Sequence, residues 1–352
     1  MDDGGRPPTA WGIIFAVTDD REFREANLWS TPIRDLHLTI EGTPLEGIIA
    51  KFLEELVKAG IKKLRPRCYL STEWGVPFGT IAIGIPFYLA HPSLKALHEE
   101  QTAHVEGLSP TDILRYLRHE MGHVVNYGYT LYDEPEWVGL FGSMTQPYAE
   151  EYRPSPFSRR YVRYLPGWYA QKHPDEDWAE TFAEWMTPGS RWRREYKDWP
   201  AALAKLEYCH RRMGELADTP PVVADDELDE DVGEIEETVE QWYGSQPKLE
   251  EAPPAGIEGA LMALFGDLAG EGEGVPAADL ILRLEKDLCA NVFRWTGHFP
   301  ERTRPLLRFM ADQARELDLC YAAAEEPKAV VAVTTLVAAL AMNFVHRGGY
   351  MP

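Results

Sequence analysis

The sequence predicts an α+β fold in the N-terminal part of the chain and an all-α domain at the C-terminus. Before residue 216, stretches with helical apolar spacing occur together with strand-like stretches, whereas only helical spacing follows residue 257. Between these parts, 225–240 holds ten Asp and Glu residues and no basic residue. Because such a composition buries too little apolar surface to fold, we expect a flexible acidic linker at 217–256 between domains at 1–216 and 257–352.

Five stretches carry this fold prediction. PLEGIIAKFLEELVKAG at 44–60 predicts an amphipathic helix, and RCYLSTEW at 67–74 and TIAIGIPFYLA at 80–90 predict strands of a small sheet. In the C-terminal region, apolar residues repeat at helical spacing over 277–297 and 300–319. No group of residues in this second region indicates catalysis, so we expect the chemistry to lie in the first.

Composition limits the class of protein. The formal net charge of −22 argues against a nucleic-acid partner, because phosphates would be repelled. Four scattered cysteines without a CxxC pair favour reduced thiols, and the N-terminus MDDGGRPPTAWG shows no signal peptide, so we expect a cytoplasmic protein. The uncharged stretch 329–345 is slightly short for a membrane span and rich in Ala and Thr, so we expect a buried core helix and no membrane partner.

A helix with defined ends is predicted at 109–128, SPTDILRYLRHEMGHVVNYG. Ser109 is a good N-cap, Pro110 suits the first turn, and Asp112 can complete a capping box. Gly128 suits a left-handed stop. The predicted helix therefore includes His119, Glu120 and His123.

Two histidines of this helix, His119 and His123, lie one turn apart on one face, so both imidazoles can reach one cation. Glu120 lies about 100° around the helix, where its carboxylate can contact a metal-bound water without being a ligand. This HExxH spacing is typical of zinc hydrolases, but an ordinary helix with polar residues on one face gives the same pattern. A third ligand is needed to distinguish the two.

The stretch HPDEDWAETFAEWMTPGS, 173–190, predicts a second helix on which Glu176, Glu180 and Glu184 line one face. Its large aromatic residues indicate that the helix is partly buried, and buried carboxylates need a partner such as a cation. For Glu184 we expect a solvated position. Glu176 and Glu180 remain candidates for the third ligand.

Together, HEMGH and HPDEDWAETFAEW resemble the motifs of the gluzincin metallopeptidases. They are similar to lethal-factor-type HExxH peptidases and to a bacterial family named "putative zinc-binding metallopeptidases", and the resemblance covers about 30–215. It implies a zincin-like catalytic domain, with a small mixed sheet, an active-site helix and a helical subdomain, that binds Zn²⁺. It also implies Glu176 as the third ligand and Glu180 as the acceptor that orients a zinc-bound histidine, with the reverse assignment still open.

The resemblance implies a reaction as well. Zinc held by His119, His123 and Glu176 would activate a water, and Glu120 would act as the general base in hydrolysis of a peptide or protein substrate. Tyr169 resembles the family's hydrogen-bond donor to the oxyanion. Nearby tyrosines that could take this place are Tyr161 and Tyr164.

The second predicted strand offers a place for the substrate. Its residues Thr80, Ala82 and Gly84 form a nearly bare face, and Pro86 favours a sheet edge, so an extended peptide could add to this strand.

Two alternative functions and one further site remain open from the sequence. The chain could be a non-catalytic zinc-bearing module that binds a protein through its C-terminal helices, or a zinc hydrolase of a non-peptide substrate.

Over 153–212, twelve Lys and Arg outnumber eight Asp and Glu. This is either a mixed solvated surface or a basic face that favours acidic substrates or binds the acidic linker.

Overall fold

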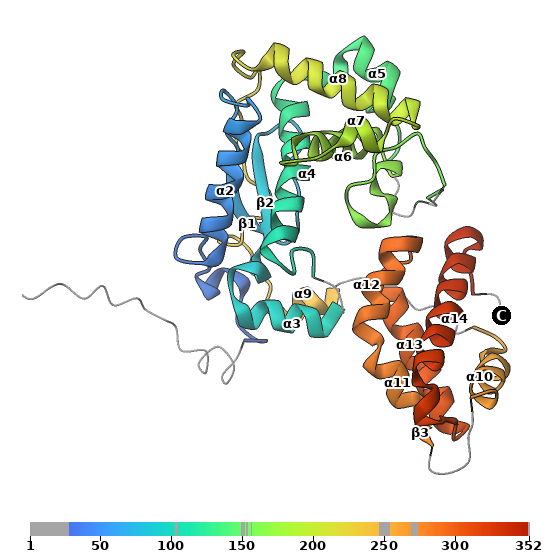
Figure 1. Ribbon diagram of the computed structural model, residues 1–352. Coiled ribbons are helices and arrows are strands. Elements are labelled where there is room, and N and C mark those ends of the chain that lie inside the picture. Colours follow the sequence, from blue (N-terminus) through green and yellow to red (C-terminus); the bar gives the residue numbers. More distant parts are fainter. Residues whose placement is uncertain are drawn as a thin grey trace, which may run out of the picture.

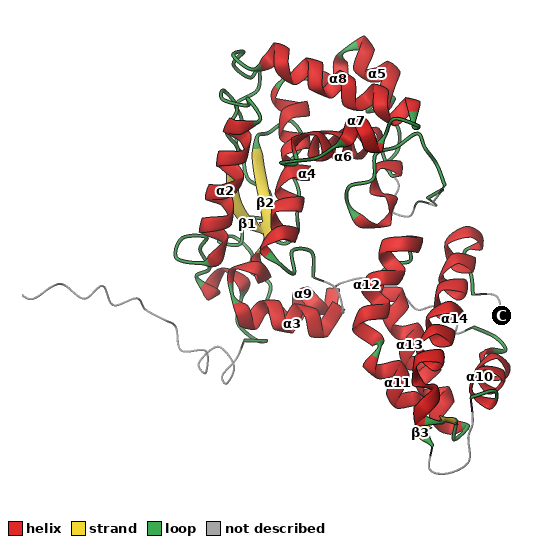
Figure 2. Cartoon of the chain, viewed as in Figure 1, coloured by secondary structure: helices red, strands yellow, loops and turns green. Residues whose placement is uncertain are grey.

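The computed structural model describes residues 28–102, 105–148, 152, 154–155, 157–245, 254–268 and 274–350. Figure 1 shows two groups of elements, one from the N-terminal part of the chain and one from the C-terminal part. Helices predominate in both, and the N-terminal group also contains a two-stranded sheet (Figure 2). This mixture agrees with the α+β prediction.

The N-terminal group contains a parallel strand pair and most of the helices. Its elements are α2 (Pro44–Lys58), β1 (Arg67–Ser71), β2 (Ala82–Pro86), α3 (Pro92–Thr102), α4 (Pro110–Gly128), α5 (Pro135–Phe141), α6 (Pro174–Met186), α7 (Trp192–Glu195), α8 (Pro200–Leu216) and α9 (Val239–Ser245), with the 3₁₀ helices η1 (Ile33–Leu36), η2 (Phe87–Ala90), η3 (Leu131–Asp133) and η4 (Pro166–Gln171). β1 and β2 pair in parallel, with Arg67 opposite Ala82. Both strands are shorter than predicted. β2 ends at Pro86 because the chain turns directly into η2.

Helix α4 begins as predicted and ends differently. Ser109 is the N-cap, and its capping box is complete. Gly128, predicted as a left-handed stop, is instead the last residue of the helix, and the C-cap is Tyr129 with a φ of −113°. A Cβ on Gly128 would lie 3.3 Å from Leu64, and the Gly128 carbonyl accepts a hydrogen bond from the backbone N–H of Val222. The glycine is therefore explained by close packing rather than by a turn.

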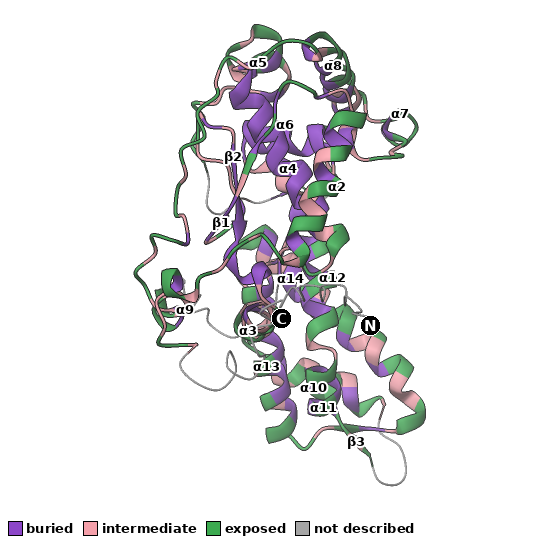
Figure 3. Cartoon of the chain, turned by 90° about the vertical axis from the view of Figure 1, so that its left-hand side faces the viewer, coloured by how far each residue is buried: buried purple, intermediate pink, exposed green. Residues whose placement is uncertain are grey.

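The core of the N-terminal group lies around α4, α6 and β2, which are largely buried (Figure 3). Helices α4 and α6 approach each other closely, because a Cβ on Gly122 would lie only 2.6 Å from the Ala179 Cα. Trp178 is fully buried, and its indole N–H donates to the Gly122 carbonyl at 2.7 Å. Gly122 thus permits a backbone-to-backbone contact that determines how α6 crosses α4.

Residues 222–239, the acidic strap, lie along the N-terminal group, although their composition predicts a flexible linker. The Ile81 N–H donates to the Asp225 carbonyl at 2.7 Å, and the Val232 N–H donates to the Leu70 carbonyl at 3.1 Å. Val232 and Val239 are buried in the core. The linker prediction therefore fails for 217–245, whereas 246–253 lie outside the described residues.

The charges of the acidic strap explain this outcome. Their carboxylates are mostly exposed, so they remain hydrated while the backbone and two valines make the contacts. Asp226 pairs with Arg67 at 3.5 Å, and Glu236 pairs with Arg34 at 2.6 Å. These partners lie outside 153–212, so the idea that the acidic segment binds that basic region is not supported by the ion pairs of the described residues.

The C-terminal group has its own hydrophobic core. Its elements are α10 (Ile257–Gly266), β3 (Val275–Pro276), α11 (Ala277–Arg283), α12 (Glu285–Thr296), α13 (Pro300–Glu316), β4 (Cys320–Tyr321), the 3₁₀ helix η5 (Ala323–Glu325) and α14 (Glu326–Arg347). β3 and β4 pair antiparallel, so the prediction of an all-α domain missed a strand pair of two residues on each side, too short to show an alternating pattern. α14 is long and apolar enough to cross a membrane by length and composition, and 33% of its most apolar window is buried. Val333, Val337 and Ala341 place one face of α14 in the core, whereas Val331 on another face is 65% exposed. The predicted core helix is therefore buried along one face.

We predict that Gly122→Ala destabilises the N-terminal group by about 1–3 kcal/mol, because the added methyl group forces α4 and α6 apart. The matched control is Gly139→Ala in α5, where a Cβ meets nothing within 4 Å. That change should be neutral or stabilise by about 0.5–1 kcal/mol, since alanine restricts the unfolded chain. Urea denaturation followed by tryptophan fluorescence tests both, because of the 11 Trp only Trp295 lies beyond residue 257. Equal midpoints for the two variants would contradict the close crossing.

Candidate metal centre

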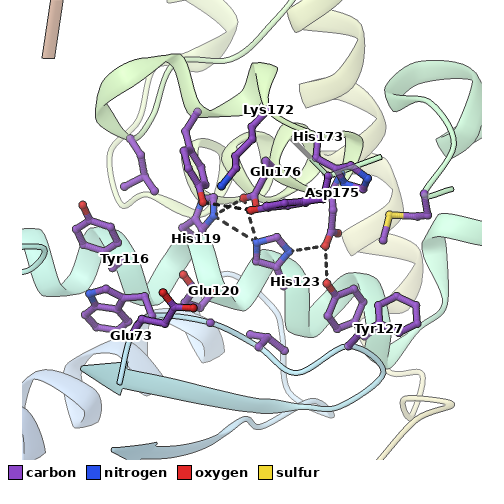
Figure 4. A pocket seen from close by; sticks show the side chains of 18 of the residues that line it. Glu73, Tyr116, His119, Glu120, His123, Tyr127, Lys172, His173, Asp175 and Glu176 are labelled. Carbon is purple, nitrogen blue, oxygen red and sulfur yellow. Dashed lines mark hydrogen bonds and ion pairs between the residues drawn. The ribbon is translucent and has the colours of Figure 1, made fainter. Parts of the chain in front are cut away.

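The crossing of α4 and α6 brings the predicted ligands together (Figure 4). His119 Nε2 lies 3.0 Å from Glu176 Oε2, and His123 Nε2 lies 3.4 Å from the same oxygen. The two Nε2 atoms are 3.3 Å apart. Ligand atoms on a tetrahedral zinc with bonds of about 2.0–2.1 Å lie about 3.3 Å from one another. Two imidazole nitrogens and one carboxylate oxygen, all buried, thus fit a zinc ion in both chemistry and spacing.

Glu180 is turned away from this triangle. Its Oε1 lies 3.0 Å from His119 Nδ1, and its Oε2 accepts hydrogen bonds from the backbone N–H groups of Tyr164 and Leu165 at 2.9 and 2.8 Å. Both oxygens are therefore engaged, and Glu180 is fully buried. The geometry favours Glu176 as the ligand and Glu180 as the group that orients His119.

Asp175 lies beside the second histidine as Glu180 lies beside the first, and this role was not predicted from the sequence. Its Oδ2 lies 2.9 Å from His123 Nδ1, and its carboxylate accepts hydrogen bonds from Asn126 and Tyr127 at 2.7 and 2.5 Å. In the sequence, Asp175 is one of three acids at a helix start, where acids are common for another reason. The sequence feature that could have pointed to Asp175 is its position directly before the candidate ligand Glu176.

The carboxylates set the electrostatics of the site. Burial opposes protonation of His119, but hydrogen bonds to Glu176 and Glu180 raise its pKa to about 9. Burial alone would raise the pKa of Glu176, yet the two histidines hold it well below its usual value. The site therefore favours positive charge at its centre, as a cation-binding site requires.

Glu120 lies beside the triangle, on the wall of the cleft (Figure 4). Its side chain is buried, and among the described residues no donor forms a hydrogen bond or ion pair with its carboxylate. Burial raises the pKa of Glu120, although the two nearby histidines act in the opposite direction. Glu120 is thus a carboxylate of increased basicity that is directed at the cleft.

Two tyrosines lie on the other side of the triangle. Tyr148 donates a hydrogen bond to Glu176 Oε1 at 2.6 Å, and its hydroxyl lies 3.4 Å from that of Tyr169. The ring of Tyr169 lies 5.6 Å from that of His119, and both tyrosines line the cleft. Tyr148 was not identified from the sequence, because its position in a loop far from either motif carries no local signal.

Tyr161 and Tyr164, the other candidates for the oxyanion donor, have partners outside the cleft. Tyr161 faces the Lys205 ammonium, and the hydroxyl of Tyr164 accepts a hydrogen bond from Arg118. Neither lines the cleft. Glu184 is also outside it, where its Oε1 accepts a hydrogen bond from Ser190.

The cleft has a volume of about 890 Å³ and is bordered by the segment between β1 and β2. The sequence predicts β2 itself as the free edge for a peptide, but Ala82 is fully buried and the Gly84 N–H donates to the Gly75 carbonyl at 2.8 Å. Instead, 73–76 lies at the cleft. The prediction placed the free sheet edge on β2, but after Ser71 the chain folds back over β2 and covers it. The alternation of residues within one strand does not reveal such a covering segment.

Comparison with known proteins gives a family match for the part of the chain that carries the site. Residues 106–189 match the family described as "Putative zinc-binding metallo-peptidase". The match confirms the resemblance predicted from the sequence, and it covers both α4 and α6, so it includes the histidines and the glutamates of the site. No curated protein and no solved structure matches the chain.

We predict that Glu176→Gln weakens zinc binding more than Glu180→Gln does. Loss of a ligand charge should reduce affinity by more than about 100-fold, whereas loss of the group that orients His119 should reduce it by about 10–100-fold. Competition with a fluorescent zinc chelator measures both. Glu184→Gln, on the same helix but bonded to Ser190, is the matched control and should leave the affinity unchanged. The opposite order for the first two variants would make Glu180 the ligand.

Proposed function

We propose that this protein is a zinc-dependent peptidase of the HExxH gluzincin type, built on a zincin-like N-terminal domain. The observation that carries the proposal is the buried carboxylate of Glu120, which no donor in the described part of the chain engages, next to a His–His–Glu group at an open cleft. The family match over both motifs supports a peptidase in general. The packing of α4 against β2, with the histidines on its far side, supports the zincin-like arrangement.

His119, His123 and Glu176 would hold the zinc ion, with Glu180 and Asp175 fixing the two imidazole rings. Bound zinc supplies Lewis acidity, which polarises a carbonyl group and lowers the pKa of water. Glu120 takes the proton from the attacking water and transfers it to the amine of the leaving peptide. Burial raises the pKa of Glu120, which makes this carboxylate a better acceptor of the proton.

Tyr169 donates a hydrogen bond to the oxyanion that develops on the scissile carbonyl, and Tyr148 positions Glu176. The hydroxyl of Tyr148 is already engaged with a ligand oxygen, which supports this division of roles. A phenol contributes to catalysis where negative charge develops in a site from which water is largely excluded.

The alternative, a non-catalytic zinc-bearing binding module, predicts the same ligands but assigns no use to Glu120. An unpaired buried carboxylate has a desolvation cost, so its retention beside a metal centre favours the enzyme. Metal content cannot separate the two functions, because both require zinc.

We predict that Glu120→Gln lowers the turnover of a proteome-derived peptide mixture by about 10²–10⁴-fold while zinc content is unchanged, because the amide cannot accept the proton. Mass spectrometry of the products together with elemental analysis tests this. If wild type and variant, both loaded with zinc, yield the same peptides, Glu120 is not the base. If the zinc-loaded wild type cleaves nothing, the binding-module function is favoured.

We predict that Tyr169→Phe lowers kcat by about 10²–10³-fold with zinc affinity retained. Tyr148→Phe should instead weaken zinc binding, because Glu176 loses the donor that holds its second oxygen. Steady-state kinetics and chelator competition on both variants separate the roles. Tyr161→Phe, outside the cleft, should change neither quantity, and a loss of kcat in Tyr148→Phe alone would reverse the assignment.

A further inference from the structure

Two aromatic side chains of the C-terminal group line the same cleft as the metal-binding residues. The residues around the cleft include His119, Glu120, Phe293 and Phe299. Phe293 belongs to α12, and Phe299 lies in the connection from α12 to α13. The C-terminal group thus supplies one wall of a cleft whose other walls carry the proposed catalytic groups.

The position of this wall is fixed by a close contact with η4. A Cβ on Gly167 would lie 2.9 Å from the Phe293 ring, and Gly167 has a φ of +80°, so glycine is required there for two reasons. Tyr152 donates a hydrogen bond to the Gly167 carbonyl at 2.7 Å, which holds the same turn from another side.

A second contact lies toward the other end of α12. Lys286 forms an ion pair with Glu99, and the guanidinium of Arg304 donates to the Glu100 carbonyl. Such exposed polar contacts contribute little stability, but they act on α3, a different element from η4. The C-terminal group is therefore oriented by two separate contacts, with Phe293 at the one next to the cleft.

The aromatic wall lies close to the proposed reacting groups. η4 carries Tyr169, whose ring lies 5.6 Å from His119. Leu165, directly before η4, lines the cleft and donates its N–H to Glu180, which in turn holds His119. One short element therefore contacts both the aromatic wall and the support of a candidate metal ligand, and the wall and His119 line one cleft.

The wall is suited to an apolar group. The rings of Phe293 and Phe299 lie 5.3 Å apart, and Phe299 is only partly buried. Covering such a ring with a substrate side chain removes apolar surface from water, and aromatic pairs add a favourable ring contact. We propose that Phe293 and Phe299 form an apolar subsite that selects substrates with a large apolar side chain next to the scissile bond. This inference rests on the proposed function for the class of substrate.

The test measures binding as well as turnover. The probes are two zinc-chelating dipeptide hydroxamates that differ only in a phenylalanine or a glycine side chain, titrated into the zinc-loaded full chain. The phenylalanyl probe should bind at least about tenfold more tightly to wild type. In Phe299→Ala this ratio should fall to within about twofold, and Phe299→Leu should retain part of it, because leucine keeps some apolar surface. Peptides cleaved by wild type should show the same preference.

The matched control is Trp295→Ala, which removes an aromatic ring from the same helix at a position that is 63% exposed and not part of the cleft. It should leave the ratio unchanged. Zinc content and the urea midpoint show whether each variant is folded, and Phe299→Leu serves if the alanine variant is not. Equal binding of both probes by wild type, or an unchanged ratio in the folded Phe299 variants, overturns the subsite. Discrimination between the probes without peptide cleavage would leave the subsite standing and reject the peptidase function.

Discussion

The contact between Gly122 and Ala179 is the constraint on which the rest of the site depends. Two helices that meet backbone to backbone leave no room for large side chains between them, so the groups on either side of the contact are brought within a few ångströms. His119 and His123 flank Gly122 on α4, and Glu176 and Glu180 flank Ala179 on α6. A wider crossing would separate imidazoles from carboxylates, and no choice of rotamer would restore a common centre.

Buried charges next to the ligands hold this crossing from outside. Arg118, before the first histidine, pairs with Glu55 of α2, with 2.9 Å between Arg118 Nη2 and Glu55 Oε2. Asp177, after the candidate ligand Glu176, pairs with Lys205 of α8 at 2.5 Å, although burial still raises the pKa of this carboxyl to about 7. Buried ion pairs are weak stabilisers because desolvation offsets their attraction, but a misplaced partner is costly. They therefore specify the rotation of each helix rather than add much to the stability of the fold.

Local chemistry was enough to predict parts of the site from the sequence. The capping box at Ser109 and the one-turn spacing of the histidines depend on neighbours along the chain, and both are observed. The choice between Glu176 and Glu180 could not be made in this way, since both lie on one face of α6. The backbone N–H groups of Tyr164 and Leu165, which lie outside α6 and engage Glu180, favour Glu176 as the ligand.

The same reasoning explains the larger differences from prediction. Counting charges at 225–240 gave a linker, but a segment needs only a few buried anchors and backbone partners to order, and its partners on β1 and before β2 lie about 150 residues away in the sequence. The position of Phe293 at the cleft could not be predicted either, because an apolar residue on a helix is equally consistent with a position in the core. What sequence patterns cannot supply is the identity of the surface that a segment meets.

The acidic strap also extends the set of contacts on which the N-terminal group depends. A chain cut at residue 216 would keep every side chain of the metal centre, yet it would leave the Leu70 carbonyl and the Ile81 N–H without their partners and remove two core valines. The contacts of the N-terminal group therefore extend to α9, about thirty residues beyond α8, the last long helix of this group. A chain break within that interval would disturb the packing of the N-terminal group itself, whereas one after Ser245 would leave those contacts in place.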